Sequence, residues 1–251
     1  MAAPVGVTLS GKVLTVTLDR PDKRNALSSA VVEALHEALE RAELDADVRV
    51  MVLRGAGRDF CAGADLDELL ASADRPPADN EASARRLGDV FVGIRRLPKP
   101  VLAAAQGRAL AGGAGLATAC DIVLAATGAQ LGYPEVQRGF VPAMVATILR
   151  RLAGEKAALD LLLTGRTVNA EEALALGLVS RVVPDGELDA ALARLAESLT
   201  AASPSALAFT KRLFMELDGR TFEDGIAQGA RVNAAARMTP DFREAVARFL
   251  R

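Results

Sequence analysis

The chain has 251 residues and a formal net charge of −2; hydrophobic residues make up 51% of it and aromatic residues only 4%, which predicts an aliphatic core. The balance of 30 basic and 32 acidic side chains argues against a broad nucleic-acid surface and against an acidic disordered chain. A single histidine excludes a two-histidine metal site, and two cysteines exclude a disulfide framework or a four-cysteine zinc site. We therefore expect chemistry that uses carboxylates and backbone groups.

No targeting or membrane segment is predicted. The first residues lack the basic start and long apolar stretch of a signal peptide. The most apolar region, residues 101–126, is interrupted too often by polar residues and glycines to predict a membrane-spanning helix. We expect a soluble cytoplasmic protein without a membrane partner.

Strands and helices are predicted to alternate over the first three quarters of the chain. A hairpin is expected over residues 5–18, because β-branched residues flank the turn signal Ser10-Gly11. Helical spacing and apolar runs then predict, in order, a helix at 28–46, strands at 48–53 and 99–105 with a helix at 81–97 between them, a helix at 113–120, a strand at 122–126, helices at 145–153, 155–163 and 169–177, and a strand at 178–183.

Only helical patterns follow Pro184, and residues 72–80 read as a mobile insert. An alternating body with a helical end predicts an α/β core carrying a helical appendage.

Two phosphate-binding patterns fail. Residues 6–13 nearly match a P-loop, but Val13 stands where magnesium binding needs Ser or Thr. Residues 113–118 place Thr118 where the dinucleotide fingerprint has its third glycine. We interpret His36 as a surface side chain, and the acidic residues around Asp65 as favouring a helix start rather than a metal site.

Three segments are unusual for a purely structural domain: residues 58–66, 106–121 and 131–144. The second is rich in glycine where a helix is predicted to begin, and free N–H groups at a helix start bind negative charge. The third carries Glu135 among apolar residues. Two backbone donors and a buried carboxylate would suit proton transfer next to a carbonyl group.

With these segments in their order along the chain, the sequence resembles the crotonase superfamily, which is also called the enoyl-CoA hydratase/isomerase family. The resemblance runs from residue 20 to residue 249 and rests on motifs in the family order: RPDKRNAL at 20–27, FCAGAD at 60–65, AGGAGLATACD at 111–121, Pro134-Glu135, LTGR at 163–166 and AEEALALGLV at 170–179. It implies an α/β fold, with a crotonase-like ββα spiral core at residues 1–190 and a C-terminal helical trimerisation region at 191–251. It also implies self-association as a homotrimer or a dimer of trimers.

The resemblance further implies an acyl-CoA thioester substrate, with coenzyme A as part of the substrate, no other cofactor and no metal. Residue by residue, Ala62 and Gly112 match the two oxyanion-hole donors, and Glu135 matches a catalytic glutamate. Arg24 matches a basic residue that approaches the CoA phosphates. The loop that would line the thioester path consists of Cys61, Ala62, Gly63, Ala64 and Asp65.

One departure concerns the type of reaction. Family hydratases with two catalytic glutamates carry the first of them where this chain has Gly115, whereas family isomerases work with one glutamate near Glu135. The sequence therefore favours double-bond isomerisation, with hydration still open. A glutamate introduced at position 115 is expected to raise hydration if the pocket has room.

Two alternatives are weighed against an acyl-CoA enzyme. Gly115 would fit a catalytically weak CoA-thioester binding or interaction protein of the same fold, and Glu135 argues against it. An RNA-binding role is disfavoured because the first helix carries Glu33, Glu37 and Glu40. The acyl group of the substrate is left open.

Overall fold

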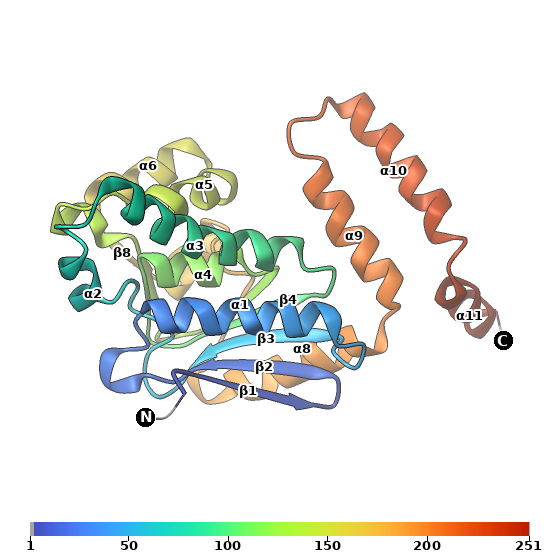
Figure 1. Ribbon diagram of the computed structural model, residues 1–251. Helices are drawn as coiled ribbons and strands as arrows, with labels where there is room; N and C mark the ends of the chain where they lie inside the picture. The colour runs from blue at the N-terminus through green and yellow to red at the C-terminus, as the bar shows by residue number, and fades with distance from the viewer. Residues whose placement is uncertain (1–2, 251) are drawn as a thin grey trace.

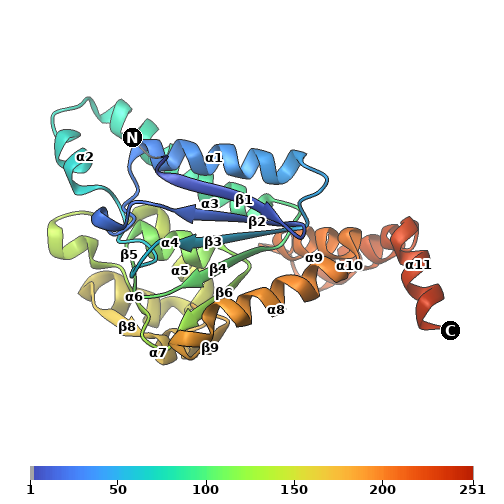
Figure 2. The same cartoon turned by 90° about the horizontal axis from the view of Figure 1, so that it is seen from below.

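The main sheet starts with the predicted hairpin. In the computed structural model, which describes residues 3–250, β1 (Val5–Ser10) and β2 (Val13–Leu18) pair antiparallel through a turn at Gly11 and Lys12. Both turn residues have positive φ, which matches the twist of a two-residue hairpin. The sheet continues with parallel strands in the order β3 (Val50–Gly55), β4 (Val101–Ala105), β6 (Ile122–Ala126) and β9 (Arg181–Val183) (Figures 1 and 2).

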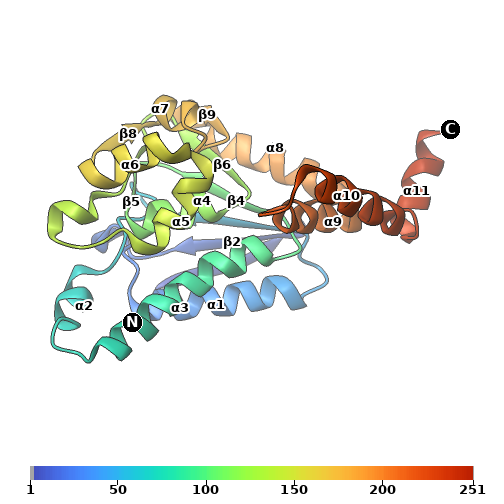
Figure 3. The same cartoon turned by 90° about the horizontal axis from the view of Figure 1, so that it is seen from above.

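Helices cover both faces of this sheet. Alternate residues of each strand point to opposite faces, so Met51 and Leu53 of β3 pack in one apolar cluster while Val50 and Val52 pack in another. The first cluster lies under α1 (Ser29–Leu44), α3 (Pro77–Arg96) and α4 (Gly112–Ala119), and α1 and α3 run side by side (Figure 3). The second lies under α8 (Leu188–Ala201), on the opposite side of the sheet (Figure 2).

A second, small sheet has three strands. It consists of β5 (Arg108–Leu110), β7 (Gln130–Gly132) and β8 (Thr167–Asn169), and a single bridge from Cys61 to Ala109 extends it. A long strand, a short strand and a helical turn thus follow one another twice, as β4–β5–α4 and as β6–β7 with the 3-10 turn η2 (Pro134–Arg138). The predicted α/β fold with a ββα core is confirmed.

The remaining helical elements complete the fold. They are η1 (Pro21–Lys23), α2 (Leu66–Ala71), α5 (Ala143–Leu152), α6 (Gly154–Thr164), α7 (Ala170–Ala175), η3 (Asp185–Glu187), α9 (Pro204–Glu216), α10 (Phe222–Ala236) and α11 (Pro240–Phe249). The three strands of the small sheet were not predicted. The prediction of an insert at 72–80 is wrong for its second half, because α3 begins at Pro77, and a proline at the first helical position favours such a start.

The predicted boundary at residues 190 and 191 falls inside α8. Leu188, Leu192 and Leu195 of α8 are buried against the main sheet, so this helix belongs to the core. The helical extension begins with α9, and α9, α10 and α11 project away from the core (Figure 1).

None of the helices in residues 3–250 combines the length and the apolar character needed to cross a bilayer.

Candidate active site

The loop at residues 60–65 is held between two other segments. On one side, the Cys61 N–H donates to the Arg108 carbonyl (3.0 Å) and the Cys61 carbonyl accepts from the Leu110 N–H (2.9 Å). On the other side, the Leu27 N–H donates to the Gly63 carbonyl (2.8 Å), and the Asp65 N–H donates to the Leu27 carbonyl (3.1 Å). The loop is therefore fixed along its whole length by backbone hydrogen bonds.

Gly63 allows the loop to turn, so that residue 61 bonds to β5 while residues 63 and 65 bond to Leu27. Its φ of +93° is a backbone conformation that side-chain-bearing residues rarely adopt. A Cβ at this position would also lie 2.8 Å from the Ala111 Cβ and 3.4 Å from the Gly112 N. The glycine thus both turns the chain and brings the loop against the start of α4.

The free donor of this loop is Ala64, not Ala62. The Ala62 N–H donates to the Arg24 carbonyl (3.0 Å), so the prediction that Ala62 is an oxyanion donor is wrong. Ala64 pairs with Leu27 in a parallel bridge in which the groups of Gly63 and Asp65 face Leu27, so the Ala64 N–H points away from it. Within residues 3–250 this N–H has no acceptor, and Ala64 is half-buried.

The second donor is the N–H of Gly112. This residue begins α4, where the N–H groups have no partner inside the helix and the helix dipole is positive. No acceptor for the Gly112 N–H is found among the described residues. Gly113 packs so closely on the loop that a Cβ there would lie 2.3 Å from the Cys61 carbonyl oxygen, which keeps the helix start beside residues 61–64.

Ala111, which precedes α4, has φ +51° and ψ −127°. This conformation suits glycine, and a residue held there stores about 1–3 kcal/mol of strain. The Ala111 N–H donates to the Gly132 carbonyl (2.8 Å), and this bond ties the helix start to β7.

Glu135 stands three residues after the end of that same strand, in η2. Its side chain is buried, with 8% of the residue exposed, and its Oε2 is a buried oxygen without a hydrogen-bond partner in the described chain. Burial raises the pKa of the Glu135 carboxyl, and Arg138 offsets this only in part. A raised pKa makes this carboxyl hold a proton more readily than a solvent-exposed glutamate does, which suits a group that takes up and returns a proton.

The Tyr133 hydroxyl is a second unpartnered buried oxygen on this segment. Tyr133 is 1% exposed, and burial together with the charge of Glu135 raises the pKa of its hydroxyl. The Thr118 hydroxyl lies beside it but donates to the Ala114 carbonyl (2.8 Å), and the two hydroxyls do not meet hydrogen-bond geometry. Sequence reasoning missed Tyr133, because an aromatic residue before Pro134-Glu135 looks like ordinary core.

Position 115 has no room for a side chain. A Cβ on Gly115 would lie 2.5 Å from Val145 Cγ1 and 3.1 Å from Phe91 Cζ. Both neighbours are buried, so they fill the space with hydrocarbon. The condition set for a glutamate at position 115 to raise hydration, room in the pocket, is therefore not met, because nothing can be added there without moving Val145.

Of three further predicted contact residues, two turn out differently and one stays a prediction. Cys61 is fully buried, burial raises the pKa of its thiol to about 12, and both its backbone groups bond β5, so the prediction that it touches the substrate is wrong. The Asp65 carboxylate is also buried; it pairs with Arg20 (2.8 Å) and caps α2 by accepting from the Asp67 N–H (3.1 Å), so it supports the loop rather than facing a ligand. Arg24 is exposed beside the loop, and its CoA contact stays a prediction.

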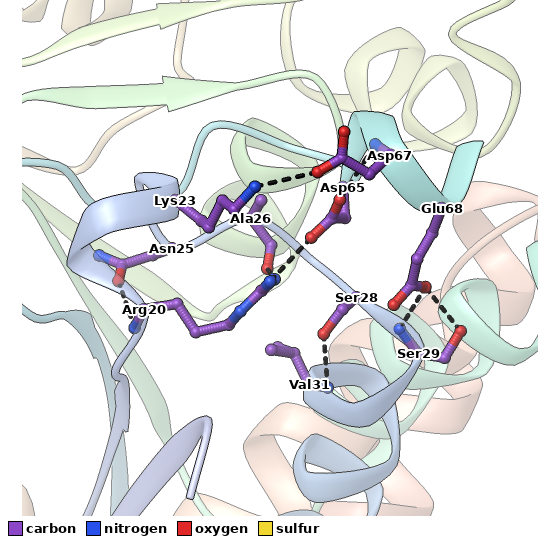
Figure 4. A network of polar contacts seen from close by, with 10 residues as sticks. All are labelled: Arg20, Lys23, Asn25, Ala26, Ser28, Ser29, Val31, Asp65, Asp67 and Glu68. Atoms are coloured by element: carbon purple, nitrogen blue, oxygen red, sulfur yellow. Dashed lines mark hydrogen bonds and ion pairs between the residues drawn. The ribbon is translucent and has the colours of Figure 1, made fainter. Parts of the chain in front are cut away.

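Figure 4 shows how the loop at 20–29 holds the start of α2. The Lys23 ammonium pairs with Asp67 (2.9 Å), and Glu68 accepts from both the backbone and the hydroxyl of Ser29 (2.8 Å each). No group of three or more histidine, cysteine, aspartate or glutamate side chains within residues 3–250 is arranged to hold a metal ion.

Comparisons with known proteins identify the family of this chain. The family model for enoyl-CoA hydratase/isomerase matches residues 8–251. A protein named putative enoyl-CoA hydratase from Thermus thermophilus is 45% identical over 239 residues, which are 95% of this chain and 94% of that protein. The 2,3-dehydroadipyl-CoA hydratase of Escherichia coli is 35% identical over 97% of this chain and 94% of its own length.

Solved structures show the same fold. The crystal structure of an enoyl-CoA hydratase from Mycobacterium smegmatis superposes on this chain with a TM-score of 0.94 at 35% identity. The superposition covers 98% of this chain and 96% of the M. smegmatis chain. The match over nearly the full length, together with the geometry of residues 60–65, 112 and 135, shows that the chain belongs to the enoyl-CoA hydratase/isomerase family.

Proposed function

We propose that this acyl-CoA enzyme transfers a proton next to the thioester carbonyl of an enoyl-CoA, and that double-bond migration is its faster reaction. The Ala64 and Gly112 N–H groups hold the carbonyl oxygen as it becomes an enolate, and Glu135 moves the proton. The reaction needs no cofactor other than the coenzyme A of the substrate. The observation that carries the proposal is Glu135, a buried carboxyl whose Oε2 has no partner in residues 3–250.

In the proposed migration, the Glu135 carboxylate removes a proton from the carbon between the thioester carbonyl and the double bond. The electron pair moves into the carbonyl, and the resulting enolate oxygen accepts hydrogen bonds from Ala64 and Gly112. The protonated Glu135 then returns the proton to the far carbon of the former double bond, which yields the conjugated thioester. One such donor contributes about 10²–10³ in kcat in enzymes that stabilise an oxyanion.

Hydration is the second candidate, and the names of the relatives favour it. It requires a water molecule held beside the β-carbon and activated there. With Val145 and Phe91 filling the space at Gly115, Glu135 is the single carboxyl we assign to this task. We therefore expect hydration of straight-chain substrates to be slower than migration.

The test is to assay both reactions with Glu135→Gln and with a matched control. The control is Glu155→Gln on α6, where an exposed glutamate is changed in the same way. Formation of the conjugated enoyl thioester, followed by its ultraviolet absorption, measures migration; its loss, with product mass, measures hydration.

Glu135→Gln should lower both rates by about 10²–10⁴, the range for a general acid–base group, while Glu155→Gln leaves them unchanged. Wild-type protein that binds acyl-CoA without turning over either substrate would instead support the binding-protein alternative. Unchanged rates in Glu135→Gln would move the base to another residue.

We also propose that the chain self-associates as a homotrimer or a pair of trimers through its C-terminal helices. A groove with a volume of about 1000 Å³ lies between α9 and α10, away from Glu135; its lining is mostly apolar, with Arg220, Asn233 and Arg237 among the polar residues. Among them Phe222 is 79% exposed and Ile226 is 62% exposed, and exposed apolar surface of this extent is typical of an interface. Light scattering that shows a monomer at micromolar concentration would refute this assembly.

A further inference from the structure

Two ion pairs join the same two segments beside the proposed oxyanion donor, and they differ in burial. Lys23 and Asp67 pair at 2.9 Å with side chains that are 57% and 82% exposed. Arg20 and Asp65 pair at 2.8 Å with side chains that are 23% and 8% exposed. Figure 4 shows both pairs between the loop at 20–29 and the start of α2.

The Arg20 guanidinium spans both strands of the Leu27–Ala64 bridge. Its Nη1 donates to the Ala26 carbonyl (2.7 Å), and its Nη2 donates to Asp65 Oδ2 (2.8 Å). Ala26 precedes Leu27, and Asp65 follows Ala64. One planar group thus fixes the spacing of the two segments directly beside the Ala64 N–H.

The Asp65 carboxylate is bound from several directions. Its Oδ2 accepts from Arg20, and its Oδ1 accepts from the Asp67 N–H (3.1 Å), which caps α2. The Arg20 guanidinium holds the pKa of the Asp65 carboxyl below its usual range, so the carboxylate stays charged and paired at neutral pH. A lysine could not replace Arg20, because an ammonium lacks the planar fork that donates in two directions at fixed spacing.

We propose that Arg20 and Asp65 are positioning residues that aim the Ala64 N–H at the thioester oxygen. The proposal rests on the proposed function, because it assumes that the Ala64 N–H polarises that oxygen. Neither side chain touches the substrate: each acts through the backbone of residues 64 and 65. The Lys23–Asp67 pair joins the same two segments at a more exposed position and has no such role.

The experiment compares Arg20→Lys and Asp65→Asn with the control variants Lys23→Met and Asp67→Asn. Arg20→Lys keeps the charge but loses the fork, and Asp65→Asn keeps the shape but loses the charge. For each protein we would measure kcat and KM, and also the absorption maximum of a bound conjugated dienoyl-CoA. A hydrogen bond to the thioester oxygen shifts that absorption to longer wavelength, and the shift reports only on folded protein with ligand bound.

Either change should lower kcat about ten- to hundredfold, part of the effect of losing one donor, and change KM by less than about threefold. The red shift of the bound dienoyl-CoA should shrink in step with kcat. Combining the two changes should cost little more than one alone, because both break the same unit. Lys23→Met and Asp67→Asn should match the wild type in rate and in absorption.

Two failures are distinguishable. If wild-type protein binds the dienoyl-CoA with no red shift, the proposed function fails, because no donor polarises the thioester. If the wild-type shift is present and persists in full in Arg20→Lys and Asp65→Asn, the positioning role is refuted even where these variants melt at lower temperature. A loss of shift in the Lys23 or Asp67 variants equal to that in the Arg20 variant would also refute it, since the buried pair would then have no special part.

Discussion

Gly115→Ala tests whether the position that lacks a side chain is closed. The new Cβ would lie 2.5 Å from Val145 Cγ1 and 3.1 Å from Phe91 Cζ, and the branched Val145 side chain cannot swing away freely. Overpacking of this kind costs about 1–3 kcal/mol. Replacing glycine inside a helix returns about 0.5–1 kcal/mol, so we expect a net loss of about 0.5–2 kcal/mol.

For a chain of this length, a loss of about 0.5–2 kcal/mol lowers the melting temperature by about 1–8 °C. Thermal unfolding followed by circular dichroism would measure it. Val145→Ala in the same chain should recover part of the loss, because it removes the atom that the new Cβ meets. Gly115→Glu should gain hydration only in combination with Val145→Ala.

If Gly115→Ala melts at the same temperature as the wild type or at a higher one, the prediction is wrong. Position 115 would then have room, and the assignment of a single carboxyl to the site would lose its structural basis. Hydration raised by Gly115→Glu alone would contradict it in the same way.

Four further changes have expected outcomes. Glu135→Gln should raise the melting temperature at neutral pH; because burial raises the pKa of Glu135, its ionisation costs stability as pH rises through that pKa, so the gain should vanish at about pH 4, where the carboxyl is protonated in the folded and the unfolded chain. Tyr133→Phe removes an unpartnered buried hydroxyl, so chemical denaturation should show stability unchanged or higher by about 1–3 kcal/mol, and a loss above 1 kcal/mol would reveal a hidden partner. Ala111→Gly relieves a positive φ and should add about 1 kcal/mol to the free energy of unfolding, whereas a loss would place the strain elsewhere. Ile226→Asp should shift the mass found by light scattering toward the monomer, and an unchanged mass would exclude the α9–α10 groove as an interface.

The sequence predicted the elements whose periodicity is long enough to recognise. The stripe of Val31, Val32 and Leu35 marked the buried face of α1, the β-branched residues around Ser10-Gly11 identified β2, and a continuous apolar run identified β3. The strands β5, β7 and β8 have three residues each, too few for a period of two to show, so they were missed. The place of α8 depended on a tertiary contact with the sheet that its own pattern does not reveal.

The site was predicted less completely, for physical reasons. Glu135 and Gly112 were singled out because the motifs mark them; Glu135 is buried and Gly112 begins α4, and their catalytic roles stay predictions. The choice between Ala62 and Ala64 depends on backbone direction, which the φ of Gly63 sets and which no residue pattern records. Arg20 was missed because its partner lies 45 residues away in the chain.

In the proposed function, Glu135 moves a proton at the carbon next to a thioester carbonyl. Hydrogen exchange in deuterium oxide tests this step directly. A saturated acyl-CoA is incubated with the enzyme, and mass spectrometry follows the deuterium that enters the carbon beside the carbonyl. This readout is the same for an isomerase and for a hydratase, because both must form the enolate. We predict exchange with wild-type protein, slowed by about 10²–10⁴ in Glu135→Gln. Equal exchange rates in the two proteins would contradict the account.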